Sequence, residues 1–469
     1  MVIIVHSAES KGSIAANIGG LDYSYYFVLK KYRPVLEKFA FVIEVRNPAS
    51  EVDAIYQNCQ ARGEPCLFLS FTPPFKTTMD LQCPTISVFA WEYLMLPTDV
   101  WGGDPRNDWR NVFRRQGRTI THSSFAVRSV QLAMGKDFPV WSIPAPVWDD
   151  YAKLYREEKT SARSDGVDLT LDVNFIDFKG CSAVTTIQDD KTGFVEQRSS
   201  SSAHGKKACL HLEGIIYTTV FNPNDGRKNW MDLLWGFCWA FREVEDVTLV
   251  MKLAYYDYET VRGLIIREIK KLAPFKCRVV ALHGFLDDDS YAKLIRESTY
   301  VVNTAHGEGQ CLPLMEYMSA GKPAVAPAHT AMEDYVNRDN AFVVKSSMEW
   351  IHWPHDPRLA LRTFRYRINW ESLYHAYQES YTVAKNDPNR YLRMSRCAVE
   401  SLKMYCSKAV AEERLKMVFQ VCGMFDEGWL ISKCRKTWRK TAGLRQLLQG
   451  KSTHLFVQTR SFLTKFLEV

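Results

Sequence analysis

Short apolar runs alternate with helical stretches through the first 150 residues. Five of these runs are rich in β-branched and aromatic residues and are shorter than a typical buried helix. They are MVIIV, FAFVIEV, CLFLSF, TISVFA and RTITHS. Helical stretches over 25–38, 51–61 and 124–134 lie between or after them. This alternation predicts a parallel sheet with helices on both faces.

A second series of the same kind fills residues 207–369. Its predicted strands are GIIYTTVF, VTLVMKL, RVVALHGF, YVVNT and PAVAPA, and its predicted helices are 229–242, 258–273, 288–298 and 312–320. We therefore expect an α/β protein with two doubly wound, Rossmann-like domains that face a central cleft. A ligand of such a protein binds at the carboxyl ends of both sheets.

The composition shifts suggest where these domains begin and end. The first domain is expected over 1–150 and the second over 207–369. Residues 151–206 are polar, contain the β-like runs VDLTLDVNFIDF and SAVTTI, and end in RSSSSAHGKK. We predict a linker or insertion there, with an exposed serine-rich loop. Residues 370–423 are helical, and we expect one helix among them to return and complete the first domain.

The overall composition is that of a folded protein. The 469 residues are 46% hydrophobic and 24% charged, which excludes wholesale disorder. The net charge of +7 is small for this length and does not by itself call for nucleic acid. The twelve cysteines are scattered without CxxC pairs, and the opening MVIIVHSAES lacks the features of a signal peptide. We therefore expect a cytoplasmic protein with reduced thiols.

Most of the net charge lies in the last 45 residues. Residues 425–469 hold nine Lys or Arg against three Asp or Glu. On a helix, Leu430, Cys434, Trp438 and Ala442 would form one apolar stripe with the basic residues largely off it. This basic amphipathic tail either packs on the protein body or lies peripherally at the inner face of a membrane.

The segment YVVNTAHGEGQCLPLMEYMSAGKP combines the strongest chemical signals. Glu308 lies on a glycine-flanked loop after a strand, and Glu316 lies eight residues later on a short helix, so both can face one cavity. Pro313 suits the first turn of that helix, and Gly321 ends it. The amides at the helix N-terminus could hold a pyrophosphate. These amides belong to Gly309, Gln310, Cys311 and Leu312.

Further candidate residues follow other strands. Arg227 and Lys228 come between a strand and a helix, where two cations favour an anion. Gly284 would allow close approach of a base or phosphate, or simply end a strand. Gly19 and Gly20 follow the first strand. The run Asp287–Asp289 directly precedes a helix, so we expect it to cap that helix and expect no essential metal or other cofactor.

These residues resemble a known family. GEGQCLPLMEYMSAGKP resembles the E-x7-E motif of retaining GT-B glycosyltransferases, in particular family four, and the RKN junction resembles that family's phosphate clamp. The run FAWEYLMLPTDVW … THSSFAVRSV … VWSIPAPV is similar to its acceptor side. The resemblance extends over roughly 85–335. It implies a GT-B fold and transfer of a sugar, with retention, from a nucleotide-diphosphate donor.

The resemblance also implies roles for single residues. Glu308 would contact hydroxyls of the donor sugar, Glu316 would hold the nucleotide ribose, and Lys228 with Arg227 would bind the diphosphate. This sequence departs from the family at two places: Asn222 stands where many members have Arg, and Trp91 with Glu92 stands where many have His. The resemblance places Trp91, Gly19 and Gly20 on the acceptor side. Glu92 is either a catalytic carboxylate on that side or the partner of a basic neighbour.

The predicted function is therefore a glycosyltransferase that acts on a glycan or lipid-linked acceptor in surface polysaccharide synthesis. Two other functions are compatible with the same fold. One is a GT-B sugar-nucleotide epimerase, and the other is a catalytically silent protein that binds a nucleotide or carbohydrate. Release of free nucleotide diphosphate in the presence of an acceptor would separate the enzyme from the binding protein.

Overall fold

The computed structural model describes residues 1–14, 16–20, 22–157, 163–181, 194–197 and 208–424. Residues Met1–Leu415 form one compact unit. The predicted serine-rich loop and the basic tail over 425–469 lie outside the described residues. Among the residues that the structure describes, no helix is both long and apolar enough to cross a bilayer.

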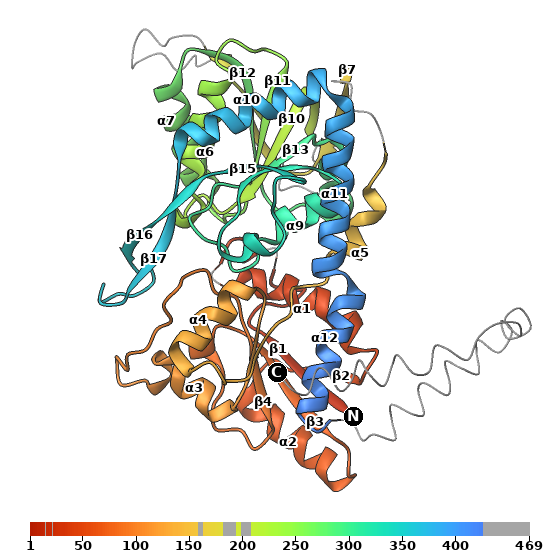
Figure 1. The fold of residues 1–469 in the computed structure, drawn as a ribbon, viewed down its shortest axis with the longest axis vertical. Helices are drawn as coiled ribbons and strands as arrows, with labels where there is room; N and C mark the ends of the chain where they lie inside the picture. Colours follow the sequence, from red (N-terminus) through yellow and green to blue (C-terminus); the bar gives the residue numbers. More distant parts are fainter. Residues whose placement is uncertain (15, 21, 158–162, 182–193, 198–207, 425–469) are drawn as a thin grey trace, which may run out of the picture. The chain divides into compact units, whose positions relative to one another are not determined.

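The first 150 residues form a six-stranded sheet in the order β2-β1-β3-β4-β5-β6 (Figure 1). Every neighbouring pair is parallel, as predicted. The strands are β1 Val2–Ser7, β2 Phe41–Glu44, β3 Cys66–Phe71, β4 Thr85–Val88, β5 Thr119–Thr121 and β6 Val140–Ser142. The helices are α1 Tyr23–Leu36, α2 Pro48–Ala61, α3 Trp109–Gln116 and α4 Ser124–Met134. Two of these elements were not predicted: β6, which has three residues, and α3, whose sequence WRNVFRRQ is strongly charged.

The second sheet has nine strands, ordered β15-β14-β13-β10-β11-β12-β8-β9, with β7 paired to β10. Its central strands are β10 Ala208–Phe221, β11 Val247–Leu253, β12 Phe275–His283, β13 Tyr300–Val302, β14 Ala324–Pro327 and β15 Ala341–Val344. The helices are α6 Trp230–Ala240, α7 Tyr258–Leu272, α8 Asp288–Glu297 and α9 Leu312–Ser319. The strand order reverses between β10 and β13, which is where such sheets bind ligands. Together the two sheets confirm the predicted fold class.

The interpretation of 151–206 as a linker or insertion needs correction. After the short helices α5 Trp148–Tyr151 and η3 Ala152–Leu154, the chain forms β7 Arg163–Leu171, β8 Asn174–Cys181 and β9 Phe194–Gln197. These strands pair antiparallel with the second sheet or with each other. Phe175, Ile176 and Phe178 are buried in its core. Residues 163–181 and 194–197 thus extend the second sheet, and their polar alternate positions explain why they looked like a linker.

A two-stranded ribbon that the sequence did not predict follows β15. Its strands are β16 Ser346–His352 and β17 Arg362–Ile368, paired antiparallel. The ribbon contacts the first half of the chain, where Met95 N donates to Thr363 Oγ1 at 3.1 Å. Arg358, between the two strands, forms an ion pair with Asp99 at 3.6 Å and lies over the ring of Trp101.

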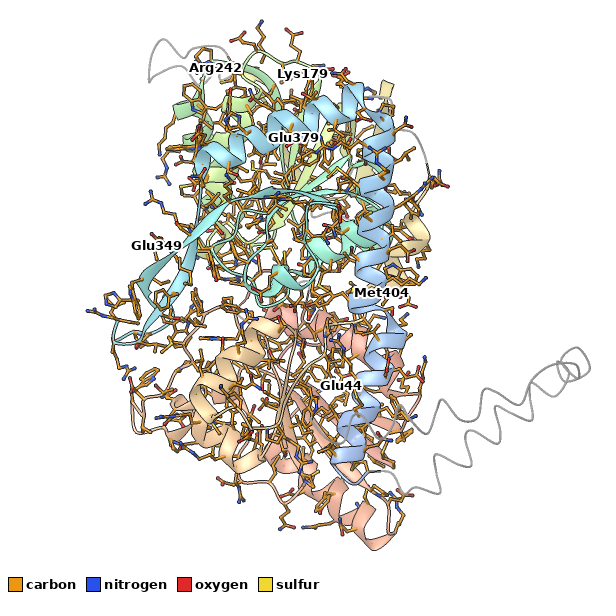
Figure 2. The ribbon with its side chains drawn as sticks, in the orientation of Figure 1. Glu44, Lys179, Arg242, Glu349, Glu379 and Met404 are labelled. Carbon is orange, nitrogen blue, oxygen red and sulfur yellow. The ribbon has the colours of Figure 1, made fainter. Side chains whose placement is uncertain are left out.

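Three helices fill the region predicted to be helical: α10 Trp370–Asn386, α11 Pro388–Cys406 and α12 Lys408–Val421. Met404 marks the solvent side of α11 and is 73% exposed (Figure 2). Next to it, Tyr405 Oη donates to His122 O at 2.9 Å, and Arg414 Nη1 donates to Ser142 O at 2.8 Å. The chain therefore returns to the first sheet, where we expected a helix to complete the first domain.

Candidate functional site

A cavity of about 1140 Å³ lies at the carboxyl ends of both sheets. Its walls come from the loops after β1 and β4 in the first half, and from the loops after β10, β11, β12 and β13 in the second. Glu308 and Glu316 both line it, as their placement on a loop and a helix predicted. The cavity is therefore built from the segments that carried the chemical signals in the sequence.

Glu308 lies on the loop after β13 and is 3% exposed. Lys228 Nζ donates to its Oε1 at 2.8 Å and to its Oε2 at 3.0 Å, and Arg227 Nη1 donates to its Oε2 at 3.0 Å. Burial alone would raise the pKa of Glu308, but the two cations lower that pKa to about 2. The carboxylate is thus charged and held in place at neutral pH.

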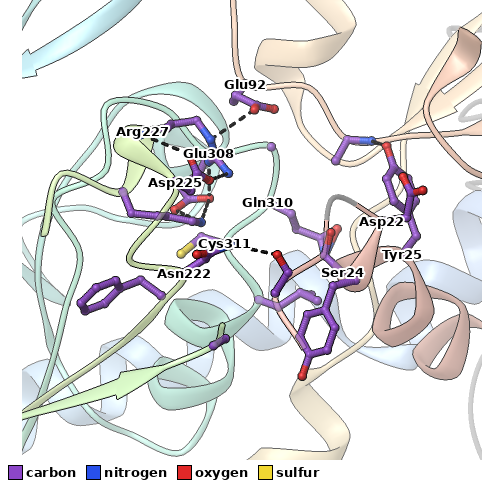
Figure 3. Close-up of a pocket in the computed structure, with 18 of the residues that line it drawn as sticks. Asp22, Ser24, Tyr25, Glu92, Asn222, Asp225, Arg227, Glu308, Gln310 and Cys311 are labelled. Atoms are coloured by element: carbon purple, nitrogen blue, oxygen red, sulfur yellow. Dashed lines mark hydrogen bonds and ion pairs between the residues drawn. The ribbon is translucent and has the colours of Figure 1, made fainter. Parts of the chain in front are cut away.

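Arg227 and Lys228 belong to the short helix η4 Gly226–Lys228, directly after β10. Asp225 begins this turn by accepting from Arg227 N at 3.1 Å. The Arg227 side chain also forms ion pairs with Asp225 at 3.0 Å and with Glu92 at 3.2 Å (Figure 3). Two cations and three carboxylates therefore form one network, which joins the first half to the second.

Glu92 follows β4 and lines the same cavity. It pairs with a basic neighbour, Arg227, which is one of the two roles predicted for it. Burial raises the pKa of Glu92, and Arg227 opposes that rise. Glu92 and Glu308 thus share one guanidinium, yet their pKa values shift in opposite directions. A pair of carboxyl groups with divergent pKa values can divide acid and base roles between them.

The loop between the two glutamates meets the first half through bare backbone. A Cβ on Gly309 would lie 2.8 Å from Ala90 Cβ, so glycine is required for this approach. Gln310 Oε1 accepts from Ala145 N at 3.1 Å. Cys311 caps α9 with a φ of 62°, and its thiol accepts from Asn303 Nδ2. The amides of residues 309–312 therefore lie at the start of α9, beside the cavity that they line.

Glu316, on α9, has partners of its own. Tyr291 Oη donates to Glu316 Oε2 at 2.8 Å, and the ring of Tyr151 packs edge-on against Tyr291. Burial raises the pKa of Glu316, and the positive charge of Lys31 opposes that rise. Tyr151, Tyr291 and Lys31 were not predicted, because each comes from a distant segment with an ordinary local pattern. They line the same cavity as Glu308 and surround the Glu316 carboxyl group there.

The predicted glycines have different roles. Gly19 has a φ of 78°, and a Cβ there would lie 2.2 Å from Ala254 O, so this loop packs tightly against the second half. Asn222, which replaces the family's Arg, donates from Nδ2 to Gly19 O at 2.8 Å. Gly20 lines the cavity. Gly284 does not: its φ of 133° turns the chain after β12, and the following Phe285 and Leu286 line the cavity instead.

Trp91 stands in an aromatic wall. Its ring centroid lies 5.4 Å from Tyr93, 4.6 Å from Trp109 and 5.6 Å from Trp353. Trp353 comes from the loop of the unpredicted ribbon, so the second half completes a wall that the first half begins. The four rings are buried and pack edge to face, so they make a rigid side of the cavity that they line.

The acidic run over 287–289 behaves as a helix start. Asp287 accepts from Ser290 N at 2.7 Å at the N-terminus of α8. Within the described part of the chain, no group of three or more His, Cys, Asp or Glu side chains could hold a metal ion. That the protein needs no metal remains a prediction.

Comparisons with known proteins agree with this geometry. The family model described as Glycosyl transferases group 1 matches residues 259–352, which include Glu308 and Glu316. HepE of Anabaena, solved with UDP-glucose, is 11% identical with a TM-score of 0.52 over 90% of this chain and 100% of that chain. Sucrose-phosphate synthase of Thermosynechococcus elongatus is 13% identical with a TM-score of 0.52 over 91% and 100%. The chain thus has the GT-B fold of glycosyltransferases, with part of its second half matching a glycosyltransferase family.

Two further comparisons do not add to this conclusion. TarM of S. aureus aligns with a TM-score of 0.43 and 11% identity over 76% of this chain, which spans only 54% of the TarM chain. A TM-score this low does not bear on the fold. No curated protein sequence matches the chain.

Proposed function

We propose that this protein is a retaining glycosyltransferase. It would transfer a sugar from a nucleotide-diphosphate donor to a glycan or lipid-linked acceptor, in surface polysaccharide synthesis. The observation that carries the proposal is the contact of Glu308 with Lys228 and Arg227 at the reversal point of the second sheet. The cations, the carboxylate and the amides of α9 line one cavity, which suits a sugar diphosphate.

Different residues would bind different parts of the donor. Lys228 and Arg227, with the amides of residues 309–312, would bind the diphosphate and stabilise the charge that grows on it as it leaves. Glu308 would accept hydrogen bonds from sugar hydroxyls, which strengthen as the sugar gains oxocarbenium character. Glu316 would accept from the ribose hydroxyls beside Tyr291. Each residue then keeps the role that the family resemblance gives it.

Retention follows from the resemblance to the E-x7-E family. In the proposed reaction, the bond between the anomeric carbon and the diphosphate oxygen breaks, and the acceptor oxygen bonds that carbon on the same face. The acceptor's proton passes to the departing phosphate. Glu92 would lie on the acceptor side and orient Arg227 and the acceptor. We assign no covalent nucleophile.

A donor screen followed by a turnover assay tests the proposal. UDP-sugars come first, because HepE was solved with UDP-glucose, and GDP-sugars follow. A bound donor should raise the unfolding temperature. At a donor concentration one hundred times the Kd, the free energy of unfolding should rise by about 2.7 kcal/mol. NMR of the product should show the donor's anomeric configuration. Inversion would reject retention, epimerised donor without transfer would indicate an epimerase, and binding without turnover would indicate a silent binding protein.

We also propose that the protein acts in the cytoplasm and that residues 429–467 of its tail contact the inner face of a membrane. The nine basic residues of the tail support this, since each contributes about 1 kcal/mol near an anionic surface. Co-sedimentation with anionic vesicles, at low and high salt, should pellet the full chain but not a chain that ends at Gly423. Equal behaviour of the two would reject the membrane contact.

A further inference from the structure

Seven described lysine and arginine side chains line the cavity, and six of them have a carboxylate partner. Arg227 and Lys228 pair as described above. The other four pairs are Lys30 with Asp288 at 3.1 Å, Lys31 with Asp150 at 2.9 Å, Lys76 with Asp22 at 2.5 Å and Arg365 with Glu349 at 2.6 Å. The seventh cation is Lys252. Its ammonium forms no hydrogen bond or ion pair with any described residue.

Lys252 lies one residue before the end of β11 and is 6% exposed. Val220 and Leu282 are its register partners on the two neighbouring strands, so apolar side chains flank it. It shares a face of the sheet with the buried Val250, because side chains alternate along a strand. Burial lowers the pKa of Lys252 to about 8.

A buried ammonium without a partner destabilises the folded protein, whereas a methionine or leucine at the same position would stabilise it. Such a group is therefore expected where an anionic ligand supplies the partner. The rest of the donor site needs this charge. Arg227 and Lys228 already face Asp225, Glu92 and Glu308, so two cations stand against three carboxylates. This network alone does not compensate a diphosphate.

The position of Lys252 along the sheet indicates which part of the donor it meets. The central strands run in the order β13, β10, β11 and β12. Glu308 follows β13, and Arg227 and Lys228 follow β10. Lys252 lies near the end of β11, one strand further from the sugar end, and Phe285 and Leu286 follow β12. A donor whose sugar contacts Glu308 therefore places its nucleoside side toward Lys252.

We propose that Lys252 binds the donor phosphate nearest the nucleoside and supplies the uncompensated positive charge of the site. This inference rests on the proposed function, since it assumes a nucleotide-diphosphate ligand. It adds a residue from β11 to the site, outside the two segments that resemble the family's motifs. The proposal gives Lys252 two opposite effects. It lowers the stability of the protein without ligand, and it tightens the binding of the nucleotide.

The test compares Lys252→Met with the matched control Lys30→Met, which removes a paired cation from the same cavity. Unfolding temperatures and calorimetric titrations with UDP, UMP, uridine and GDP are measured for the full chain. Lys252→Met should unfold at a higher temperature than the wild type. It should bind UDP or GDP about ten- to a hundredfold more weakly, the loss expected for one hydrogen bond to a charged group. UMP should weaken likewise, and uridine should not. Lys30→Met should bind UDP nearly as the wild type does.

Lys252→Gln, which keeps a polar hydrogen-bond donor one atom shorter than lysine and without its charge, should lose nucleotide affinity to a similar extent. Wild-type affinity for UDP and GDP in both Lys252 variants would overturn the proposal, while a loss in Lys228→Ala in the same titrations would leave the proposed function intact. An equal loss of affinity for uridine would show that Lys252 contacts the nucleoside and would also overturn the proposal. A wild-type protein that binds neither UDP nor GDP would instead count against the proposed function, and this inference would fall with it.

Discussion

Lys228 donates from Nζ to both carboxylate oxygens of Glu308, at 2.8 Å and 3.0 Å. The two residues are expected to serve different parts of one donor, the phosphate and the sugar, yet here each is the partner of the other. A diphosphate that takes over Lys228 would leave Glu308 available to the sugar hydroxyls. Binding of the leaving group and presentation of the carboxylate would then be one event.

Glu308→Gln should separate binding from turnover. The amide cannot offer the charge that an oxocarbenium-like sugar needs, so kcat should fall about 10²- to 10³-fold, as for loss of one preorganised electrostatic contact. Affinity for UDP should hold or rise, because Lys228 and Arg227 lose a competing carboxylate. Steady-state kinetics and calorimetry on the same sample give both quantities. Turnover close to that of the wild type would remove Glu308 from the reaction.

The pH dependence of the unfolding free energy should report the lowered pKa of Glu308. The pKa of Glu308 falls from 4.5 to about 2 on folding. Such a group stabilises the fold above pH 4.5, by about 3 kcal/mol, and this contribution is lost as the pH falls toward 2. The raised pKa values of Glu92 and Glu316 act in the opposite direction. The comparison of wild type with Glu308→Gln therefore isolates Glu308.

Urea unfolding at pH 5.5 and pH 3 measures this difference. The wild type should lose more of its unfolding free energy between the two pH values than Glu308→Gln does. Equal losses would mean that Lys228 and Arg227 do not depress the pKa of Glu308 in solution.

Removal of divalent metal should leave activity largely unchanged. The cations expected at the leaving group are the side chains Lys228, Arg227 and Lys252, not a metal ion. Activity is compared before and after dialysis against EDTA, and again after addition of Mg²⁺ or Mn²⁺. A complete loss that either ion restores would show that the acidic run over 287–289, or another carboxylate group, holds a metal.

Gly309→Ala should reduce transfer more than nucleotide binding. The added methyl would lie 2.8 Å from Ala90 Cβ and 3.0 Å from Trp91 N, so the loop must move away from the first half. We expect kcat to fall at least about tenfold, since small displacements at a reacting centre cost this much or more. The control is Gly263→Ala on α7, where nothing lies within 4 Å. Equal activity of the two variants would show that close contact at Gly309 is not needed.

The sequence predicted those parts of the fold whose signal is local. Parallel strands buried on both faces read as continuous apolar runs, which is why β1, β11 and β12 were found. The β-like run over 167–178 was recognised, but its place in the second sheet as β7 and β8 was not, because that pairing is long-range. The strand β9 and the ribbon were missed for the same reason. In the ribbon, Trp350 and Phe364 are cross-strand partners that no local pattern connects.

The same distinction applies to the site. Glu308, Glu316, Arg227 and Lys228 lie in two short segments with recognisable spacing, and they do line one cavity. Tyr291, Trp353 and Lys252 also line it, but they come from three other elements. Lys252 reads in the sequence as a polar interruption near the end of an apolar strand. That Lys252 lacks a carboxylate partner among the described residues becomes evident only when the ion pairs of the other six cations in the cavity are known.

We expect the contacts between the ribbon and the first half to help hold the two sides of the cavity together and so to limit entry of a donor. Separation of the two sides would break the hydrogen bond of Thr363 with Met95 and the contacts of Arg358 with Asp99 and Trp101. It would also break the ion pair of Arg227 with Glu92. Small-angle scattering should therefore find Arg358→Ala combined with Thr363→Val more expanded than the wild type, and equal dimensions would mean that the ribbon does not govern entry.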